Sequence, residues 1–439
     1  MEKYCPAIRQ TPVRCSFFAS AASYRWLVWS LLVLGYMIAF FHRMSVSVVM
    51  EPLETRFGLS PADFGAMASM YFYAYCIAQI PTGVLADSIG VRLTSGLSLI
   101  FAAAATIVFG FASSATVLYA SRFAVGIGVA ACFVCVMKAQ AQWFQEREFS
   151  TLSGICLFGG NLGSLCGQAP LALLVAALSF EDAFFSIGVA TLVLGLLCLV
   201  FVRNKPEDLN APQAQCRAVS KRGERFSLAQ FLYYVLRNKH IGIMFLYYFL
   251  LVPQFLAFAG TWSVSYIRGM YNLSLPQASN IASIQVVCFM LGSLLIGFLS
   301  DKVGKRKPFI LIPTFVIMLV WVLLACCNSS LSLTAFAVCL GGIGFFSAAF
   351  SPMMAMCKEV SPRESTGTAI ALLNTFGFLG IAIATHVYGI IVDRYLIESF
   401  AVSHGKAFLF LAAMTCLGFL AAFGMKETNG RNIVGPSMD

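Results

Sequence analysis

Three basic side chains interrupt long apolar stretches of this sequence: Arg43, Arg122 and Lys138. A charge inside a hydrocarbon layer is costly, and proteins keep one there mainly for binding or coupling. Arg43 shares one face of an expected helix with Tyr36 and Ser47. We expect Arg43, with Tyr36 beside it, to bind the anionic group of a small-molecule solute. The alternative is that Arg43 braces neighbouring helices.

Arg122 and Lys138 lie sixteen residues apart, and a regular helix turns by about 100° per residue. Their side chains therefore project to nearly opposite sides, and only one of them can face a central cavity. Lys138 is a second candidate for binding the solute. The alternative is that it extends toward the membrane surface beside Gln142 and Trp143.

Coupling to a proton needs a group that titrates near neutral pH, and imidazole is one. No carboxylate lies near the middle of an apolar stretch, since Asp63 and Asp393 stand at the ends of theirs. His42, next to Arg43, is therefore the hypothesised carrier of a coupling proton. A single structural hydrogen bond from His42 is the alternative.

Four uncharged polar residues are further candidates for contact with the solute. Asn161 and Gln168 are seven residues apart and share one helical face, while Gln254 and Asn374 lie in apolar stretches of the second half. Close packing against a neighbouring helix is predicted for another face of the Asn161 stretch, where glycine recurs every four residues at Gly159, Gly163 and Gly167.

The composition of the chain indicates the environment of these side chains. The chain of 439 residues is 59% hydrophobic and 11% charged, with a mean hydropathy of +0.83, so it belongs in a lipid bilayer. We predict an all-α membrane protein with twelve transmembrane helices in two pseudo-symmetric halves of six. The expected spans are about 24–50, 63–86, 93–113, 117–144, 150–178, 182–202, 240–267, 277–300, 308–328, 331–357, 365–392 and 405–425.

Charge sets the expected orientation, because loops rich in Lys and Arg stay in the cytoplasm. Basic residues concentrate in both tails and in two clusters, 203–239 and 302–307, so both termini are placed inside. This division gives a cytoplasmic tail (1–23), an N-terminal six-helix bundle (24–203), a cytoplasmic linker (204–239), a C-terminal six-helix bundle (240–425) and a second cytoplasmic tail (426–439).

Several other functions are not indicated. The net charge of +10 follows from basic cytoplasmic loops and predicts no nucleic-acid partner. Cys132-x-x-Cys135 lies in an apolar span without a second pair nearby, so we interpret it as packing and expect no metal. The sequence shows no clustered catalytic set and no phosphate-binding loop. We expect no enzyme activity, no cofactor and a monomeric protein.

A ten-residue pattern occurs twice, 214 positions apart, at 83–92 and 297–306. We name these segments the first and second repeat loops. Each follows the second span of its half, and a half-chain offset is typical of transporters built by duplication. The coinciding residues are Gly83, Leu85, Asp87, Gly90 and Arg92 in the first copy and Gly297, Leu299, Asp301, Gly304 and Arg306 in the second.

The repeat loops have the residues of a breakable latch. Gly83 and Gly297 permit close helix approach, Gly90 and Gly304 allow the turn, and the aspartates can pair with an arginine or a helix N-terminus. Such pairs stabilise one orientation of the two halves and release in the other.

With these motifs the chain resembles the major facilitator superfamily, whose signature is G-x-L-x-D-x-x-G-[RK]-[RK]. The second repeat loop is the fuller match, because the first has Ser88 and Val91 where basic residues are usual. The resemblance implies the twelve-helix fold, alternating access and a stronger latch in the second half. Arg122, in the pattern Arg122-x-x-x-Gly126, also resembles the family and is thereby implied in a proton-coupling network.

A narrower resemblance, to the organic anion and cation symporter branch, rests on Phe41-His42-Arg43-Met-Ser45 and Gln79-Ile-Pro81-Thr-Gly83. From all of this we predict a secondary transporter for an organic anion, amino acid or short peptide, working as a symporter with the proton as coupling ion. An efflux antiporter for amphipathic compounds and a receptor that has lost transport are the alternatives. The bacterial inner membrane is the expected location.

Overall fold

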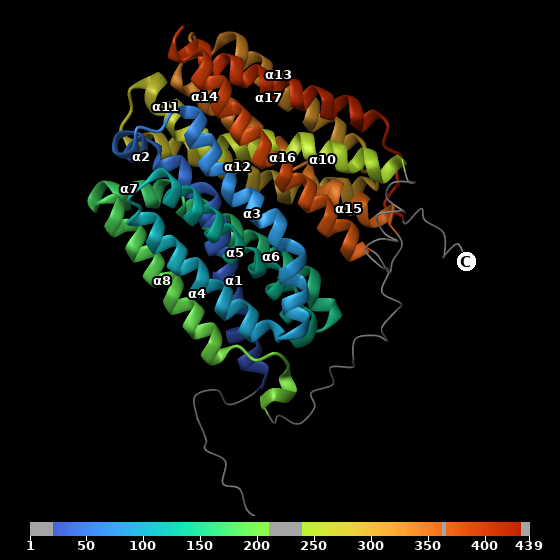
Figure 1. Cartoon of the computed structure of the whole chain (residues 1–439). Helices are drawn as coiled ribbons and strands as arrows, with labels where there is room; N and C mark the ends of the chain where they lie inside the picture. The colour runs from blue at the N-terminus through green and yellow to red at the C-terminus, as the bar shows by residue number, and fades with distance from the viewer. Residues whose placement is uncertain (1–20, 210–238, 362–365, 432–439) are drawn as a thin grey trace, which may run out of the picture.

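The computed structural model describes residues 21–209, 239–361 and 366–431. All regular structure in these residues is helical, and the helices form two bundles that meet along one side (Figure 1). The first tail, most of the linker and the end of the second tail lie outside the described residues. The domain boundaries drawn through them stay a prediction.

The N-terminal half contains six membrane-crossing segments. The first is followed by a 3-10 turn and a short helix, and the fifth is divided into two helices. These elements are α1 (Ala21–Met44), the 3-10 turn η1 (Ser45–Val48), α2 (Met50–Phe57), α3 (Pro61–Ser88), α4 (Gly90–Gly110), α5 (Ala115–Trp143), α6 (Glu146–Cys166), α7 (Ala169–Ala177) and α8 (Phe180–Phe201).

The C-terminal half also has six membrane-crossing segments, but its fourth segment is the divided one, whereas the fifth is divided in the N-terminal half. Its elements are α10 (Lys239–Ala257), the π-helical turn η3 (Phe258–Trp262), α11 (Ser263–Tyr271), α12 (Leu275–Val303), α13 (Pro308–Cys327), α14 (Leu333–Ser347), α15 (Phe350–Glu359), α16 (Thr366–Tyr395) and α17 (Phe400–Phe423).

The predicted twelve-helix architecture is confirmed. Eleven helical stretches in the described residues are long and apolar enough to cross a membrane, and α3, with 28 residues, occupies the place of the remaining span. Equivalent helices also begin alike. Ser60 before α3 and Ser274 before α12, 214 positions apart, each form a capping box that satisfies free backbone N–H groups.

Two expected spans are broken where a straight helix was predicted. The span expected at 150–178 divides into α6 and α7 at Gly167 and Gln168, just before Pro170. The span expected at 331–357 divides into α14 and α15 at Ala348 and Ala349, just before Pro352. Proline lacks the backbone N–H group that a continuous helix needs, so both breaks have a local cause.

The glycine repeat in the fifth span packs as predicted. A Cβ atom at Gly163 would lie 2.2 Å from the backbone oxygen of Met37, and one at Gly167 would lie 2.5 Å from that of Phe41. Only glycine therefore allows α6 to approach α1 at this distance.

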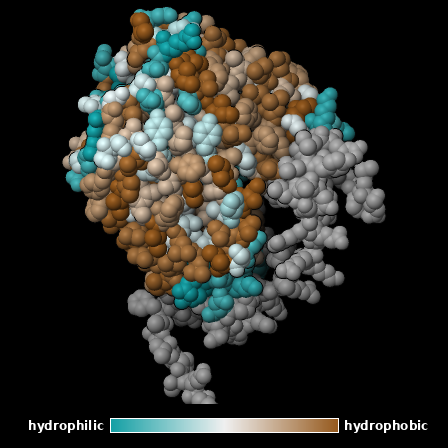
Figure 2. Space-filling view, viewed as in Figure 1, coloured by the Kyte–Doolittle hydropathy of each residue, from teal (hydrophilic) through white to brown (hydrophobic). Residues whose placement is uncertain are grey.

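The outer surface matches a lipid environment. Figure 2 shows a broad, mostly apolar surface on the face in view, with hydrophilic residues gathered toward its ends. Large apolar side chains such as Val84, Leu294, Phe298 and Ile312 are exposed. Such a surface covers too much area for a soluble monomer but suits contact with acyl chains.

Candidate functional site

A cavity of about 470 Å³ lies between the two halves. Side chains from α1, α3, α5 and α6 line it on one side, and side chains from α10, α12, α14, α15 and α16 line it on the other. Because both halves contribute walls, any movement of one half against the other changes the cavity. This is the arrangement expected of a solute site in a duplicated bundle.

Arg43, in the last turn of α1, is the one charged side chain among the described residues that line the cavity. Three aromatic rings surround its guanidinium carbon, with ring centroids at 4.1 Å for Phe40, 5.1 Å for Tyr75 and 4.8 Å for Phe378. Phe378 comes from α16 in the other half. In the described part of the chain no carboxylate forms an ion pair with Arg43.

The cation–π contacts partly stabilise the buried arginine, because each ring presents a negative face to it. The side chain of Arg43 is 7% exposed, and its Nε atom is buried without a hydrogen-bond partner among the described residues. A buried cation without a counter-charge favours an anion in the adjacent space. The geometry therefore supports anion binding at Arg43.

Four of the other residues predicted to contact the solute also line the cavity: Tyr36, Asn161, Gln254 and Asn374. Gln168 does not. Its side chain is fully buried, and its Nε2 atom donates to the backbone oxygen of Ala259 in the other half at 3.1 Å. Gln168 thus connects α6–α7 to the turn η3 at the closed end of the molecule.

The cavity is closed at the end that carries α2 and α11, which we name the far end. There Glu51 and Arg268 form an ion pair between the halves. A Cβ atom at Gly65 would lie 2.9 Å from the backbone oxygen of Thr385, so α3 and α16 touch backbone to backbone. Toward the end with the repeat loops the two bundles diverge (Figure 1).

His42 and Arg122 lie behind the cavity wall instead of lining it. Both are 1% exposed, and Arg122 donates to the backbone oxygen of His42 at 3.1 Å. The His42 Nε2 atom lies 3.4 Å from Thr106 Oγ1, while its Nδ1 atom has no partner among the described residues. The structure thus brings together the two residues that sequence reasoning named for proton coupling.

Lys138 does not line the cavity. Its Nζ atom lies 2.8 Å from Asp87 Oδ1 and 2.5 Å from the backbone oxygen of Ala86. We expected Asp87 to pair with an arginine or a helix N-terminus, and the structure gives it a lysine from α5 as a partner. Lys138 faces the first repeat loop because α5 packs against α3 along its length.

The rest of the first repeat loop is held by the chain that follows α8. Asn204 Oδ1 accepts from the backbone N–H of Arg92 at 3.0 Å, and the Arg92 side chain donates to the backbone oxygen of Leu199 at 2.6 Å. Gly90 has a φ of +86°, which a residue with a side chain rarely adopts. At Gly83, by contrast, an added Cβ would meet nothing within 4 Å, so close approach is not needed there in this conformation.

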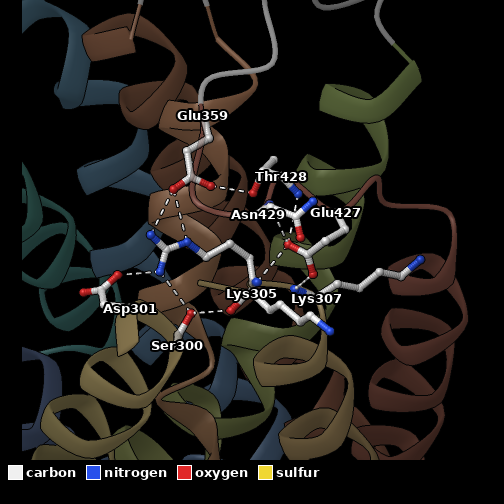
Figure 3. Close-up of polar contacts among 9 residues, drawn as sticks. Ser300, Asp301, Lys305, Lys307, Glu359, Glu427, Thr428 and Asn429 are labelled. Carbon is white, nitrogen blue, oxygen red and sulfur yellow. Dashed lines mark hydrogen bonds and ion pairs between the residues drawn. The ribbon is translucent and has the colours of Figure 1, made fainter. Parts of the chain in front are cut away.

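The second repeat loop lies in a larger polar network (Figure 3). Arg306 donates to Asp301 at 2.5 Å, to Ser300 at 3.0 Å and to Glu359 at 2.9 Å. Gly304 has a φ of +69° and ends α12. A Cβ atom at Gly297 would lie 3.1 Å from the hydroxyl oxygen of Ser351, so α12 does approach α15 at this glycine.

The segment after α17 completes this network. Glu427 accepts backbone N–H bonds from Arg306 at 2.9 Å and Lys307 at 2.8 Å, and Thr428 donates to Glu359 (Figure 3). Partial burial acts to raise the pKa of Glu427, but its backbone N–H donors prevail and hold that pKa below the usual value. Glu427 is thus an ionised cap at the start of α13.

Sequence reasoning did not list several residues of these sites. Tyr75 and Gln79 line the cavity one helical turn apart, and their spacing of four was a usable signal. Phe378 could not be found, since nothing local distinguishes it from other apolar residues of its span. Glu359 and Glu427 became visible only through the contacts of Arg306.

The fold and site define a helical membrane transporter whose two halves both line a central cavity. The family model of the major facilitator superfamily matches residues 32–385 and, in a second match, 254–435. The chain belongs to the major facilitator superfamily, and it is a transporter-family protein, not an enzyme.

Curated relatives extend over most of the chain. A probable galactarate/D-glucarate transporter of Bacillus subtilis (strain 168), GudP, is 25% identical over 84% of this chain and 86% of its own length. The membrane sensor protein UhpC of Escherichia coli (strain K12) is 25% identical over 90% of this chain and 92% of its own.

A solved structure shares the fold. The bacterial homolog to the human lysosomal transporter Spinster, in an inward-facing and occupied conformation, superposes with a TM-score of 0.73. The two proteins are 17% identical, and the alignment covers 91% of this chain and 96% of that one.

Proposed function

We propose that this protein is a secondary active transporter that carries a small organic anion across the membrane by alternating access. The observation that carries the proposal is Arg43, a buried and unpaired cation in a cavity that both halves build. The printed name of GudP, a probable transporter of sugar acids, supports an anionic solute. An organic acid, an amino acid or a short peptide each presents a suitable carboxylate.

The orientation belongs to the same proposal. Basic residues concentrate at the end with the repeat loops, so this end is cytoplasmic, with both termini inside a bacterial inner membrane. The conformation, closed at the far end and divergent at the repeat loops, then faces the cytoplasm. Since one chain supplies both walls of the cavity, a monomer is the working unit.

We further propose symport with a proton carried by His42, with Arg122 as its neighbour. His42 precedes Arg43, and its Nδ1 atom is buried without a partner in the described residues. The negative charge of an anion bound at Arg43 favours a proton on the neighbouring His42. Anion and proton then bind favourably together, which is the thermodynamic condition for symport.

Reconstitution into proteoliposomes tests the role of Arg43. With an organic acid as labelled solute, Arg43→Gln should abolish saturable uptake, because the substituted cavity has no cation. The matched control is Arg394→Gln, which changes an exposed arginine at the end of α16 and should leave uptake intact. Unchanged uptake by Arg43→Gln would refute the proposal.

The proton is tested separately by imposing an inward pH gradient. Wild-type uptake should rise with the gradient, whereas His42→Gln should retain exchange of labelled for unlabelled solute and lose the response to the gradient. A gradient response that survives in His42→Gln would assign proton coupling to another group.

A sensor is the second candidate function, because UhpC, named a membrane sensor protein, matches nearly the whole chain. A sensor binds its ligand and does not move it. Counterflow decides between the two: accumulation of labelled acid in liposomes preloaded with unlabelled acid shows transport, while binding without accumulation shows a sensor.

A further inference from the structure

The walls of the cavity are mostly apolar, and this narrows the proposed solute. Beyond Arg43 and its rings, aromatic residues of both halves line the space, and Phe255, Phe289 and Phe350 form a continuous row with ring centroids 4.7 Å and 5.6 Å apart. Building on the proposed function, we infer that the preferred solute is a monoanion with an apolar body, such as an aryl or branched aliphatic monocarboxylate.

Aromatic rings determine the shape of the charged site around Arg43. The ring centroids of Phe40, Tyr75 and Phe378 lie within 5.1 Å of the guanidinium carbon, so aromatic rings pack around the guanidinium group. A guanidinium surrounded in this way binds through its N–H edge, which matches the two oxygens of one carboxylate. The rings also contact whatever is attached to that carboxylate, so an apolar substituent gains from them.

Three polar side chains of the cavity wall, Gln254, Asn161 and Asn374, already have hydrogen-bond partners within the protein. Gln254 donates to Ser347 at 2.8 Å and accepts from Trp321 at 2.7 Å, which engages both ends of its amide. Asn161 donates to the backbone oxygen of Leu157 at 3.0 Å, and Asn374 accepts from Tyr248 at 3.3 Å. The hydroxyls of a sugar acid would therefore lose hydrogen bonds to water with few replacements.

The charge of the cavity also limits the charge of the solute. Arg43 is the one charged residue among the described lining residues, so a dianion would bring a second carboxylate into an apolar space without a counter-charge. That desolvation is costly. The volume of about 470 Å³ accommodates a body of one aromatic ring, and burying such a body is favourable. The cavity thus favours a different solute from the sugar acids in the printed name of GudP.

Counterflow in proteoliposomes of the full chain tests this inference. Unlabelled phenylacetate, phenylacetamide, gluconate and galactarate compete at equal concentration against labelled phenylacetate. We expect phenylacetate to compete at least about tenfold better than each of the other three compounds. The amide tests the charge, gluconate tests the hydroxyls, and galactarate tests hydroxyls together with a second carboxylate.

Two substitutions at Phe289, in the aromatic row, separate an effect on solute preference from a failure to fold. Phe289→Asn places a polar group on the wall away from Arg43 and should shift the preference toward gluconate at least about tenfold. Phe289→Leu keeps the wall apolar and should preserve the wild-type order.

The outcomes separate the two proposals. If gluconate or galactarate competes better than phenylacetate while Arg43→Gln abolishes exchange, the apolar solute is refuted and the anion transporter stands. If phenylacetamide competes as well as phenylacetate and Arg43→Gln is active, anion recognition itself fails, and the proposed function fails with it.

Discussion

The two repeat loops share five residues but fix their aspartates in different ways. In the first loop Asp87 pairs with Lys138, which comes from α5. In the second loop Asp301 pairs with Arg306 of the loop itself, and Arg306 also binds Glu359. Duplicated sequence thus produces equivalent turns, while the surrounding helices decide which charges complete them.

The residues that follow the sixth helix of each half show the same divergence. Asn204 and Glu427 both accept the backbone N–H of the loop arginine, at 3.0 Å and 2.9 Å. Asn204 is neutral, whereas Glu427 is ionised and also accepts from Lys307. The second loop is therefore connected to the segment after α17 by a charged residue, whereas the first loop is connected to the segment after α8 by a neutral one.

Exposure indicates which loop contributes more to stability. The side chains of Arg306 and Glu359 are 10% and 11% exposed, while those of Lys138 and Asp87 are 23% and 56% exposed. Ion pairs weaken as water reaches them. Asp301 is itself 70% exposed, so the difference lies in the buried Arg306–Glu359 pair, from which we expect the second loop to contribute more to stability than the first.

Loss of Arg306 should have the largest effect. Arg306→Met leaves the buried Glu359 without a cation, and we expect a decrease of about 3 kcal/mol in the free energy of unfolding. Arg306→Lys, which retains the charge and loses the planar donor geometry, should cost less. Denaturant unfolding in detergent micelles measures both. If both variants lowered the free energy of unfolding by the same small amount, the network would be accessible to water and would contribute little to stability.

Replacement of the two caps compares the loops directly. Glu427→Gln should lower the free energy of unfolding by about 1–2 kcal/mol and Asn204→Ala by about 1 kcal/mol, since each removes a capping acceptor. Melting temperature of the purified variants provides the measurement. A larger loss for Asn204→Ala would reverse the ranking of the two loops.

The cap at Glu427 also predicts a pH dependence. Because the folded pKa of Glu427 lies below its usual value of about 4.5, its carboxylate stabilises the protein above that value and the contribution disappears as pH falls through the folded pKa. The stability difference between wild type and Glu427→Gln should therefore shrink on acidification from pH 6 to pH 3. A constant difference would show that the cap does not depend on the charge.

The ion pair of the first loop should have a smaller effect on stability. Lys138→Met and Asp87→Asn should each cost less than about 1 kcal/mol, because Asp87 is largely exposed. A double-mutant cycle gives the coupling between them, and the same cycle on Arg306 and Glu359 provides the matched comparison. A coupling in the first loop as large as in the second would contradict the difference in exposure.

The smallest effect on stability is expected at Gly83. Gly83→Ala meets no atom within 4 Å and replaces glycine inside a helix, so stability should change by less than about 1 kcal/mol or increase. If the halves close over the first repeat loop during transport, the same change should slow uptake. Unchanged uptake would remove Gly83 from the latch.

Much of this protein follows from local sequence. The hydrocarbon layer requires long apolar helices, so the spans were readable one at a time, and the glycine repeat at Gly159, Gly163 and Gly167 identified a packed face without knowledge of its partner. Arg43 was conspicuous because a charge inside an apolar span is rare. The breaks at Gly167 and Ala348 were missed although Pro170 and Pro352 mark them.

The sequence by itself determined the helical membrane architecture, its duplication, and the position of the charge that defines the cavity. Only the tertiary structure decided what each charge meets: Lys138 meets Asp87, Arg306 meets Glu359, and Arg43 meets Phe378 from the opposite half. Helix formation depends on neighbours three or four residues away, which the sequence displays. Contacts between helices depend on tilt, rotation and breaks summed over many residues, which no local pattern contains.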